Sequence, residues 1–302
     1  MIGVSGGAGY IGSVVVEKLC DAGHAVVVYD NLVDGHEEAV DERARLVRES
    51  IGSADLNGVD TIIHLAASAN VPESIADPKL YYYNNVEQTR QLLDNMVEVG
   101  VKKIIFASTA AIDSNTPYGN SKRACEDMIR DYSKAYGIEY CIFRFFCVVG
   151  ATEKHGESRK HETHLIPVIL DVALGKKDKV EVYGDDYFLP NGLMMDGTAI
   201  RDYIHVEDIA DAILLALPFD KGYDNFFELG TDGGYSVLDV IKQAETEIGI
   251  TIPYEIRPRR QGDVGWLVSN SWRAKKILGW EPRKSLRDII SSAYNWRKNP
   301  LY

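Results

Sequence analysis

The chain has 302 residues, of which 45% are hydrophobic and 26% charged, and its formal net charge is −12. This length and composition predict a soluble globular protein with a large core, divided into two lobes. The negative charge argues against nucleic acid or an anionic membrane as the main partner. No apolar run reaches the roughly 18 residues of a membrane span, and a strand begins almost at once, so we expect no signal peptide and a cytoplasmic location.

The first predicted unit is a strand at residues 2–5, a turn, a helix at 13–22 and a second strand at 25–29. The turn has a glycine at every third position: Gly6, Gly9 and Gly12. Such glycines let the backbone approach a pyrophosphate, and the helix N-terminus offers unpaired N–H groups to it. Asp30 ends the second strand, where a carboxylate binds ribose hydroxyls and repels a 2′-phosphate. The unit therefore predicts an NAD site.

Alternating strands and helices continue to residue 146, which predicts an α/β fold with a doubly wound parallel sheet, a Rossmann domain. Further strands are expected at 46–47, 61–67, 103–107 and 140–146, and helices at 78–99 and from 117 past 126. The less regular part, 147–302, predicts a smaller C-terminal substrate-binding lobe, with 200–232 partly returning to the sheet. Its expected strands are at 180–184, 201–206 and 226–229. Its expected helices are at 165–174, 207–217, 236–248, 271–278 and 286–298.

A candidate catalytic group follows the strand at 103–107. Ser108 and Thr109 end this strand, and Tyr118 and Lys122 lie four residues apart on the next helix, so they share a face. An ammonium beside a phenol favours the phenolate and lowers the pKa of the tyrosine, which suits proton transfer. Taken alone, such a pair is more often a solvated helix surface. The cofactor motif upstream and the hydroxyl residues at the strand end favour a site.

Together these residues resemble the extended short-chain dehydrogenase/reductase family, and within it the UDP-glucose 4-epimerases. The resemblance covers nearly the whole chain. It rests on Gly-Gly-Ala-Gly-Tyr-Ile-Gly at 6–12, Asp-Asn-Leu at 30–32, His-Leu-Ala-Ala at 64–67, Tyr-x-x-x-Lys at 118–122, Glu-Thr-His-Leu-Ile-Pro at 162–167, Arg-Asp-Tyr-Ile-His-Val at 201–206 and Arg-Arg-Gln-Gly-Asp at 259–263.

The resemblance implies a role for each matching residue. Tyr118 is the expected acid/base, Lys122 its electrostatic partner and Thr109 the catalytic hydroxyl, with Ser108 as a second candidate. The expected cofactor-binding residues are Gly6, Gly9, Tyr10, Ile11, Gly12, Asp30, Asn31, Ser50, Ile51, Leu65, Ala66, Ala67, Asn85, Tyr118 and Lys122. The expected substrate-binding residues are His164, Val182, Tyr183, Arg201, Arg260 and Asp263. No metal site is expected, because neither His nor Cys is clustered.

The activity that the resemblance implies is inversion of C4 of a UDP-hexose, of the UDP-galactose/UDP-glucose type, by transient hydride transfer to NAD through a 4-keto sugar. The residues leave two alternatives open: another NAD-dependent nucleotide-sugar enzyme, such as a dehydratase or decarboxylase, and a non-catalytic sensor. Ala110 and Ala111 stand where the dehydratases carry an acidic pair, which counts against dehydration. The family also suggests a homodimer through the helices of Asn84 and Tyr118, although the apolar face of Leu92, Leu93 and Met96 could equally be core.

The sequence departs from the family pattern at several positions. Only nine positions separate Thr109 from Tyr118, where the family has a longer loop. Side chains that differ from the usual ones are Phe145 for Tyr, Cys147 for Asn, Ser50 for Asp and Ala69 for the Lys of some epimerases. These departures predict a reshaped pocket, and the sequence leaves the identity of the hexose and its N-acetyl form open.

Overall fold

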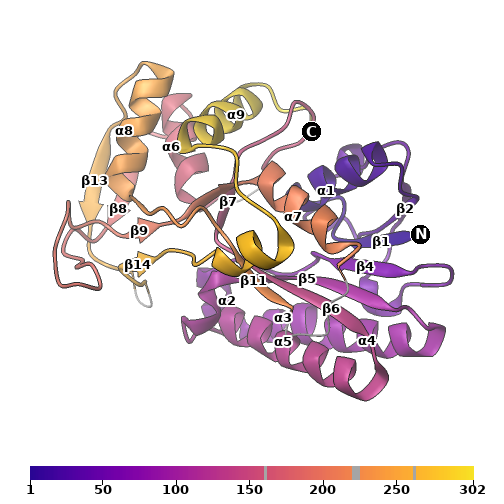
Figure 1. The fold of residues 1–302 in the computed structure, drawn as a ribbon. Helices are drawn as coiled ribbons and strands as arrows, with labels where there is room; N and C mark the ends of the chain where they lie inside the picture. The colour runs from indigo at the N-terminus through magenta and orange to yellow at the C-terminus, as the bar shows by residue number, and fades with distance from the viewer. Residues whose placement is uncertain (160–161, 220–224, 261–262) are drawn as a thin grey trace.

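A seven-stranded parallel sheet forms the centre of the molecule in the computed structural model, which describes residues 1–159, 162–219, 225–260 and 263–302 (Figure 1). In spatial order the strands are β11 (Phe226–Leu229), β6 (Glu139–Phe145), β5 (Lys103–Thr109), β4 (Thr61–His64), β1 (Ile2–Ser5), β2 (Val26–Tyr29) and β3 (Arg45–Val47). Every adjacent pair is parallel. The predicted doubly wound fold is confirmed, and its order reverses between β1 and β4, where such sheets bind ligands.

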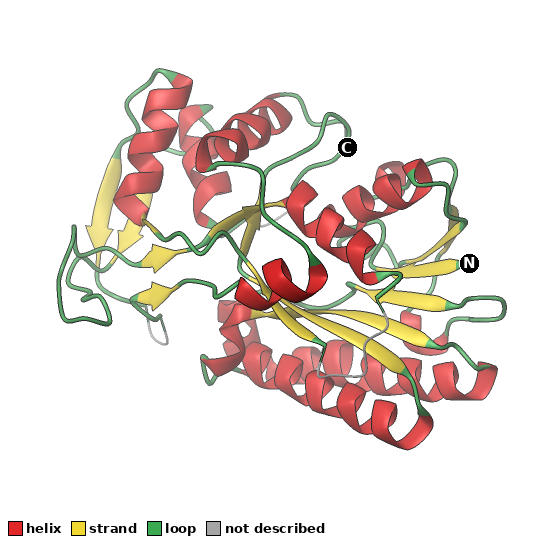
Figure 2. Ribbon diagram, in the orientation of Figure 1, coloured by secondary structure: helices red, strands yellow, loops and turns green. Residues whose placement is uncertain are grey.

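Helices cover both faces of this sheet (Figures 1 and 2). One face packs against α1 (Tyr10–Asp21) and α7 (Val206–Ala216), and the other against α4 (Gln88–Val99) and α5 (Pro117–Tyr136). The apolar face of α4 is fully buried, because Leu92, Leu93 and Met96 are each 0% exposed. Of the two readings of that face, core is the correct one.

The helix predicted at 78–99 contains a break in its hydrogen-bond pattern. It forms as α3 (Pro78–Tyr81), a π-helical segment η3 (Tyr82–Glu87) and then α4. Such π segments are common at functional sites, and this one carries Asn85, which is 2% exposed. A short helix that the sequence did not predict, α2 (Val71–Ala76), precedes it and is capped by the Asn70 side chain.

The second lobe packs three helices against a two-stranded parallel sheet. The helices are α6 (Leu165–Ala173), α8 (Val237–Ile248) and α9 (Leu286–Lys298), and the strands are β8 (Val180–Tyr183) and β13 (Tyr254–Arg257). Ser236 caps α8 in a capping box with Asp239. None of the helices in the described part of the chain is both long and apolar enough to cross a membrane.

Short elements connect the two lobes. The strand predicted at 201–206 forms as two pieces, because Asp202 between them is fully buried and accepts hydrogen bonds from the N–H groups of Thr231 and Ser269. The remaining elements are η1 (Glu37–Ala39), η2 (Ile51–Ser53), η4 (Ala110–Asp113), β7 (Cys147–Val149), β9 (Ile200–Arg201), β10 (Tyr203–His205), β12 (Tyr235–Ser236), β14 (Trp266–Leu267) and η5 (Ala274–Leu278).

Candidate active site

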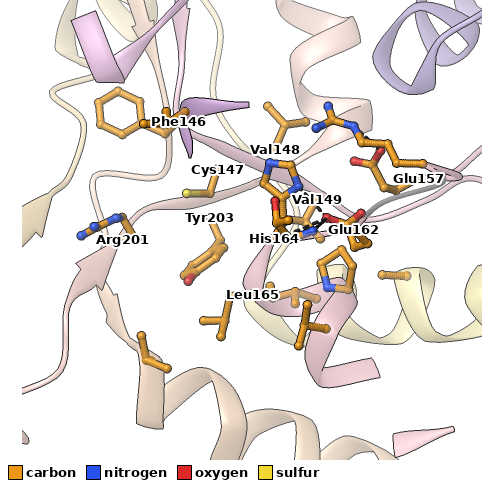
Figure 3. Close-up of a pocket in the computed structure, with 18 of the residues that line it drawn as sticks. Phe146, Cys147, Val148, Val149, Glu157, Glu162, His164, Leu165, Arg201 and Tyr203 are labelled. Carbon is orange, nitrogen blue, oxygen red and sulfur yellow. Dashed lines mark hydrogen bonds and ion pairs between the residues drawn. The ribbon is translucent and has the colours of Figure 1, made fainter. Parts of the chain in front are cut away.

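A cavity of about 820 Å³ lies between the sheet and the second lobe. Its wall includes Tyr10 after β1, Thr109 at the end of β5 and Tyr118 on α5, so it opens at the carboxyl ends of the central strands. On the other side it reaches Arg201 and Arg260 (Figure 3 shows part of this wall). The structure thus brings the predicted catalytic residues and the predicted substrate arginines to one cavity.

The glycine turn is shaped as a dinucleotide-binding turn requires. Gly6 has a φ of +72°, and a Cβ there would lie 2.7 Å from the backbone N of Ala66. A Cβ on Gly12 would lie 2.0 Å from the carbonyl oxygen of Gly6, so the helix packs close to the turn only with glycine there. Helix α1 begins at Tyr10 with no side-chain cap and no acidic residue in its first turn. Its first N–H groups are therefore suited to a phosphate, and the turn fits NAD.

The other predicted cofactor residues gather at the same edge of the sheet. Asp30 accepts hydrogen bonds from the N–H groups of Ala8 (3.0 Å) and Leu32 (2.9 Å), so its carboxylate also fixes the glycine turn. The amide of Asn31 lies 3.4 Å from the Ser50 hydroxyl. Leu65 and Ala66, with Ala67 following, come directly after β4. Ile51, in contrast, is 4% exposed and packs in the sheet core.

Tyr118 and Thr109 both line the cavity and form the centre of the site. Burial raises the pKa of Tyr118 above its ordinary value, whereas the Thr109 hydroxyl and the charge of Arg159 lower it. Thr109 also accepts a hydrogen bond of 3.1 Å from the N–H of Ala111, which fixes its side chain. A phenol and a hydroxyl thus share one point of the cavity wall.

Lys122 is on the same helix as Tyr118, but its ammonium group contacts residues of β5. Its Nζ donates a hydrogen bond of 2.8 Å to the carbonyl oxygen of Ala107 and lies 4.7 Å from the centre of the Phe106 ring. Burial lowers the pKa of Lys122 to about 8. Thr109 and Arg159 are the groups that lower the pKa of Tyr118 in this structure, and the role of Lys122 as electrostatic partner stays a prediction.

Ser108 belongs to a buried ion-pair network behind the strand. Its hydroxyl donates a hydrogen bond of 2.6 Å to Glu126, and Arg144 binds both oxygens of the same carboxylate at 2.9 Å. Burial raises the pKa of Glu126, but the bonds from Arg144 and Ser108 outweigh it and hold that pKa below its usual range. The hydroxyl of Ser108 is thus engaged in holding α5 against β5 and β6.

Asn85 joins two elements of the site through hydrogen bonds of its side chain. Its side chain accepts from the N–H of Ser68 (2.8 Å) and donates to the Ser68 carbonyl (3.0 Å) and to the Ser121 hydroxyl (2.9 Å). These bonds join the loop after β4 to α5. The structure therefore gives Asn85 a positioning role, with its amide occupied by protein partners.

The predicted substrate residues line the far end of the cavity. The guanidinium of Arg260 stacks 3.7 Å from the centre of the Tyr183 ring, and Arg201 lies 3.5 Å from the carboxylate of Asp263. Planar guanidinium groups suit a diphosphate. Val182 is 1% exposed and packs in the core of the second lobe as well as lining the cavity. Gln261 and Gly262 of the predicted motif lie outside the described residues.

The side chains that depart from the family pattern also face this cavity. Phe145, Cys147 and Ala69 all line it, and Figure 3 shows Cys147 between Phe146 and Val148 on β7. Burial raises the pKa of the Cys147 thiol to about 11, so it is an uncharged group at pH 7. These three positions of the cavity wall are therefore uncharged.

Sequence reasoning predicted His164 and the motif at 162–167 but missed Glu157 and Arg159 on the loop before them. Arg159 lines the cavity and lies 2.9 Å from Glu157. Nδ1 of His164 lies 2.7 Å from Glu162 (Figure 3). Ligand atoms of Glu157, Glu162 and His164 come within 4.8 Å of one another, close enough for a cation. Arg159 and the His164–Glu162 bond already engage these groups. The only sequence signal was the polarity of the loop.

Comparisons with known proteins agree with this geometry. Residues 2–230 match the model of the NAD dependent epimerase/dehydratase family. A UDP-glucose 4-epimerase of Lacticaseibacillus casei is 41% identical over 326 residues, covering 99% of this chain and 97% of that protein. The structure of UDP-glucose 4-epimerase from Bifidobacterium longum in complex with NAD+ and UDP is 35% identical, with a TM-score of 0.91 and coverage of 99% and 98%. That of UDP-glucose-4-epimerase from Stenotrophomonas maltophila, with bound NAD and formylated UDP-arabinopyranose, is 32% identical, with a TM-score of 0.91 and coverage of 98% and 97%. The chain therefore belongs to the NAD-dependent epimerase/dehydratase family and, within it, to the UDP-glucose 4-epimerases.

Proposed function

We propose that the protein is an NAD-dependent epimerase that inverts C4 of a UDP-hexose of the UDP-galactose/UDP-glucose type. The observation that carries this proposal is that Tyr118 and Thr109 lie on the wall of one cavity that also contains Arg201 and Arg260. That cavity runs from the glycine turn at Tyr10 to Arg201 and Arg260. Tyr10 and Ile11, which follow the glycine turn, line this cavity together with Tyr118 and the two arginines, which supports a coenzyme and a nucleotide sugar bound on either side of Tyr118. The epimerase names of its relatives support the same activity.

Tyr118 is the residue that moves a proton. It accepts the proton of the sugar C4 hydroxyl and later returns it, while Thr109 hydrogen-bonds the same oxygen. Bound NAD supplies a reversible acceptor for the hydride of C4. The glycine turn, Asp30 and Lys122 are the residues that would hold it. Because no net oxidation occurs, the protein has no need to release the coenzyme between turnovers.

Inversion requires a firm hold on the nucleotide and a loose hold on the sugar, so that the ring can turn over. Arg201 and Arg260 supply the firm hold, as two cations for one diphosphate. The cavity wall also contains uncharged side chains such as Ala69, Ala110 and Phe146. Uncharged walls make few directional bonds to hydroxyls, so the sugar can present either face.

Incubation of the purified protein with UDP-galactose tests the activity, with detection of UDP-glucose by chromatography and mass. Epimerisation leaves the mass unchanged, whereas loss of water would indicate a dehydratase and NAD binding without turnover a sensor. Tyr118→Phe should abolish interconversion while bound NAD, assayed after heat release, is retained. The matched control is Tyr136→Phe, on an exposed tyrosine of the same helix.

We also propose that residues 1–146, with part of 200–232, bind the coenzyme and that 147–302 bind the nucleotide sugar. A homodimer through the helices of Asn84 and Tyr118 is supported by large apolar side chains exposed there: Leu80, Tyr82 and Tyr83. Light scattering on Tyr83→Arg tests it, with loss of the dimer expected. All four cysteines are free in the structure, which supports a cytoplasmic location.

A further inference from the structure

The segment Gly150–Arg159, which we name the strap, crosses from the second lobe to the glycine turn. Its first residue accepts a hydrogen bond of 2.6 Å from the hydroxyl of Tyr10, the first residue of α1. Lys154 forms an ion pair of 2.9 Å with Glu17, which lies about two turns further along the same helix. His36, in the loop after β2, contacts the carbonyl of Ser158 at 3.1 Å. The strap is therefore bonded to the elements on both sides of the turn.

The opposite side of the strap is fixed to the C-terminal segment. The indole N–H of Trp296 donates to the Glu157 carbonyl (3.1 Å), and the Ser158 hydroxyl donates to the Tyr302 carbonyl (2.8 Å). Gly156 packs directly on the Trp296 ring, where a Cβ would come within 2.4 Å of it. These contacts order the strap, so a side chain that it carries is held in place before any ligand binds.

Arg159 is the charged side chain that the strap presents to the cavity. It lines the cavity together with Tyr10 and Tyr118. Its guanidinium interacts electrostatically with both of these tyrosines and with Asp34, which follows β2. The Nε atom lies 2.9 Å from the carboxylate of Glu157, whose side chain is 13% exposed. Arg159 thus lines the same cavity as Tyr10, the first residue of the helix that follows the glycine turn.

We propose that Arg159 holds the diphosphate of the bound dinucleotide against the glycine turn, with Glu157 as the positioning residue for its guanidinium. This inference rests on the proposed NAD-dependent function. The N-terminus of α1 offers N–H groups and roughly half a positive charge, while a dinucleotide diphosphate carries two negative charges. A guanidinium in the same cavity adds a full charge and a two-pronged donor. An epimerase must return the hydride from the same coenzyme, so such retention serves the reaction.

The test compares coenzyme retention in wild type, Arg159→Gln, Arg159→Lys and Glu157→Gln, with Arg287→Gln as a control. Arg287 pairs with Glu247 on the exposed side of α9, away from the cavity. The readouts are NAD per chain after gel filtration and the rate of NAD dissociation, with folding checked by circular dichroism. We expect Arg159→Gln to lose NAD roughly 10- to 100-fold faster, as for a charge-assisted hydrogen bond. The NAD dissociation rate of Arg159→Lys should lie between those of wild type and Arg159→Gln. The rate of the control, Arg287→Gln, should match that of wild type.

A double-mutant cycle and a measurement of UDP binding distinguish this inference from the alternative explanations of a loss of NAD. Glu157→Gln should weaken retention less than Arg159→Gln, and the double variant should be no worse than Arg159→Gln alone, because both changes act on one guanidinium. Wild-type NAD retention in Arg159→Gln would overturn this inference alone. Weaker UDP binding with unchanged NAD retention would overturn it in favour of a substrate contact. A wild-type protein that binds no NAD would overturn the proposed function as well.

Discussion

The ammonium group of Lys122 donates a hydrogen bond of 2.8 Å to the carbonyl oxygen of Ala107, two residues before the end of β5. This bond fastens α5 to the strand that ends in Thr109, so it fixes the distance between Thr109 and Tyr118. Burial lowers the pKa of Lys122 to about 8, so in the mildly alkaline range this bond changes from a charge-assisted one to one made by a neutral amine. Lys122 therefore positions the catalytic pair in addition to any contact with the coenzyme.

Replacing Lys122 by Met should lower both activity and stability. The carbonyl of Ala107 loses its partner, at a cost of about 1–3 kcal/mol in the free energy of unfolding. We expect kcat to fall by roughly two orders of magnitude, as when a preorganised donor is removed from an active site. Urea unfolding and steady-state kinetics measure the two effects. Lys134→Met, on the exposed surface of the same helix, is the control, and wild-type kcat in Lys122→Met would contradict the assignment.

Substitution of Ser108 should mainly lower stability, whereas substitution of Thr109 should mainly lower kcat. Ser108→Ala removes the 2.6 Å bond to Glu126, which keeps both bonds from Arg144, so we expect a loss of about 1 kcal/mol in unfolding free energy with activity largely kept. Thr109→Val keeps the shape of the side chain and removes its hydroxyl. It should reduce kcat roughly 100-fold with little change in stability. The reverse pattern in kinetics and denaturation would assign catalysis to Ser108.

The pH dependence of kcat should report the ionisation of Tyr118. A phenol that accepts a proton is active as phenolate, and burial raises its pKa above the ordinary value, so kcat should rise with pH through the alkaline range. Thr109 and Arg159 both lower this pKa. Their removal in Thr109→Val or Arg159→Gln should therefore move the rise to higher pH. Rate profiles of the two variants and wild type, measured at saturating UDP-sugar, decide the matter; a shift to lower pH would exclude this role for them.

Breaking the buried ion pair of Glu126 and Arg144 should be the most damaging change outside the cavity. Glu126 is 1% exposed, and Arg144 binds it through two bonds of 2.9 Å. In Arg144→Met a buried carboxylate keeps only Ser108 and Arg130, and such losses cost about 3–5 kcal/mol. Thermal denaturation measures the effect. Arg123→Met, on the same helix as Glu126, removes an exposed pair with Asp113 of η4 and a bond to the Ile112 carbonyl, and it should lower the melting temperature much less.

The sequence predicted most of the fold, because its signals are local. Three glycines between a strand and a helix indicate the dinucleotide turn, and apolar runs such as Thr61–His64 indicate buried parallel strands. The capping box at Ser236 is likewise a matter of neighbouring residues. The π segment that carries Asn85 was not predictable, since it depends on how the helix packs against the loop after β4.

The candidate site was predicted less completely. Strand alternation places Ser108 and Thr109 on opposite faces of β5, so their separate roles could have been inferred from the sequence. The direction of the Lys122 side chain depends on the position of a carbonyl on another element. Arg159 lies on an irregular loop with no period, and only the fold brings it to the cavity.

Acid should destabilise the protein through His64. This side chain is 1% exposed and lies between the hydroxyls of Ser5 (2.6 Å) and Thr89 (2.9 Å), and burial lowers its pKa from 6.5 to about 3. Between these two pH values the unfolded chain binds a proton that the folded one does not, so stability falls as the pH falls from 6.5 towards 3. One such group contributes a slope of up to about 1.4 kcal/mol per pH unit.

His64→Gln should therefore flatten this dependence, although it lowers stability at pH 7 by removing the ring that joins Ser5 to Thr89. Some slope should remain, because burial also lowers the pKa of His205, to about 4. Urea unfolding at pH 7, 6, 5 and 4, at one NAD concentration, gives the slope for each variant. His24→Gln, at an exposed histidine, is the control and should retain the wild-type slope. If His64→Gln also retained it, His64 would not be the group whose protonation opposes folding in acid.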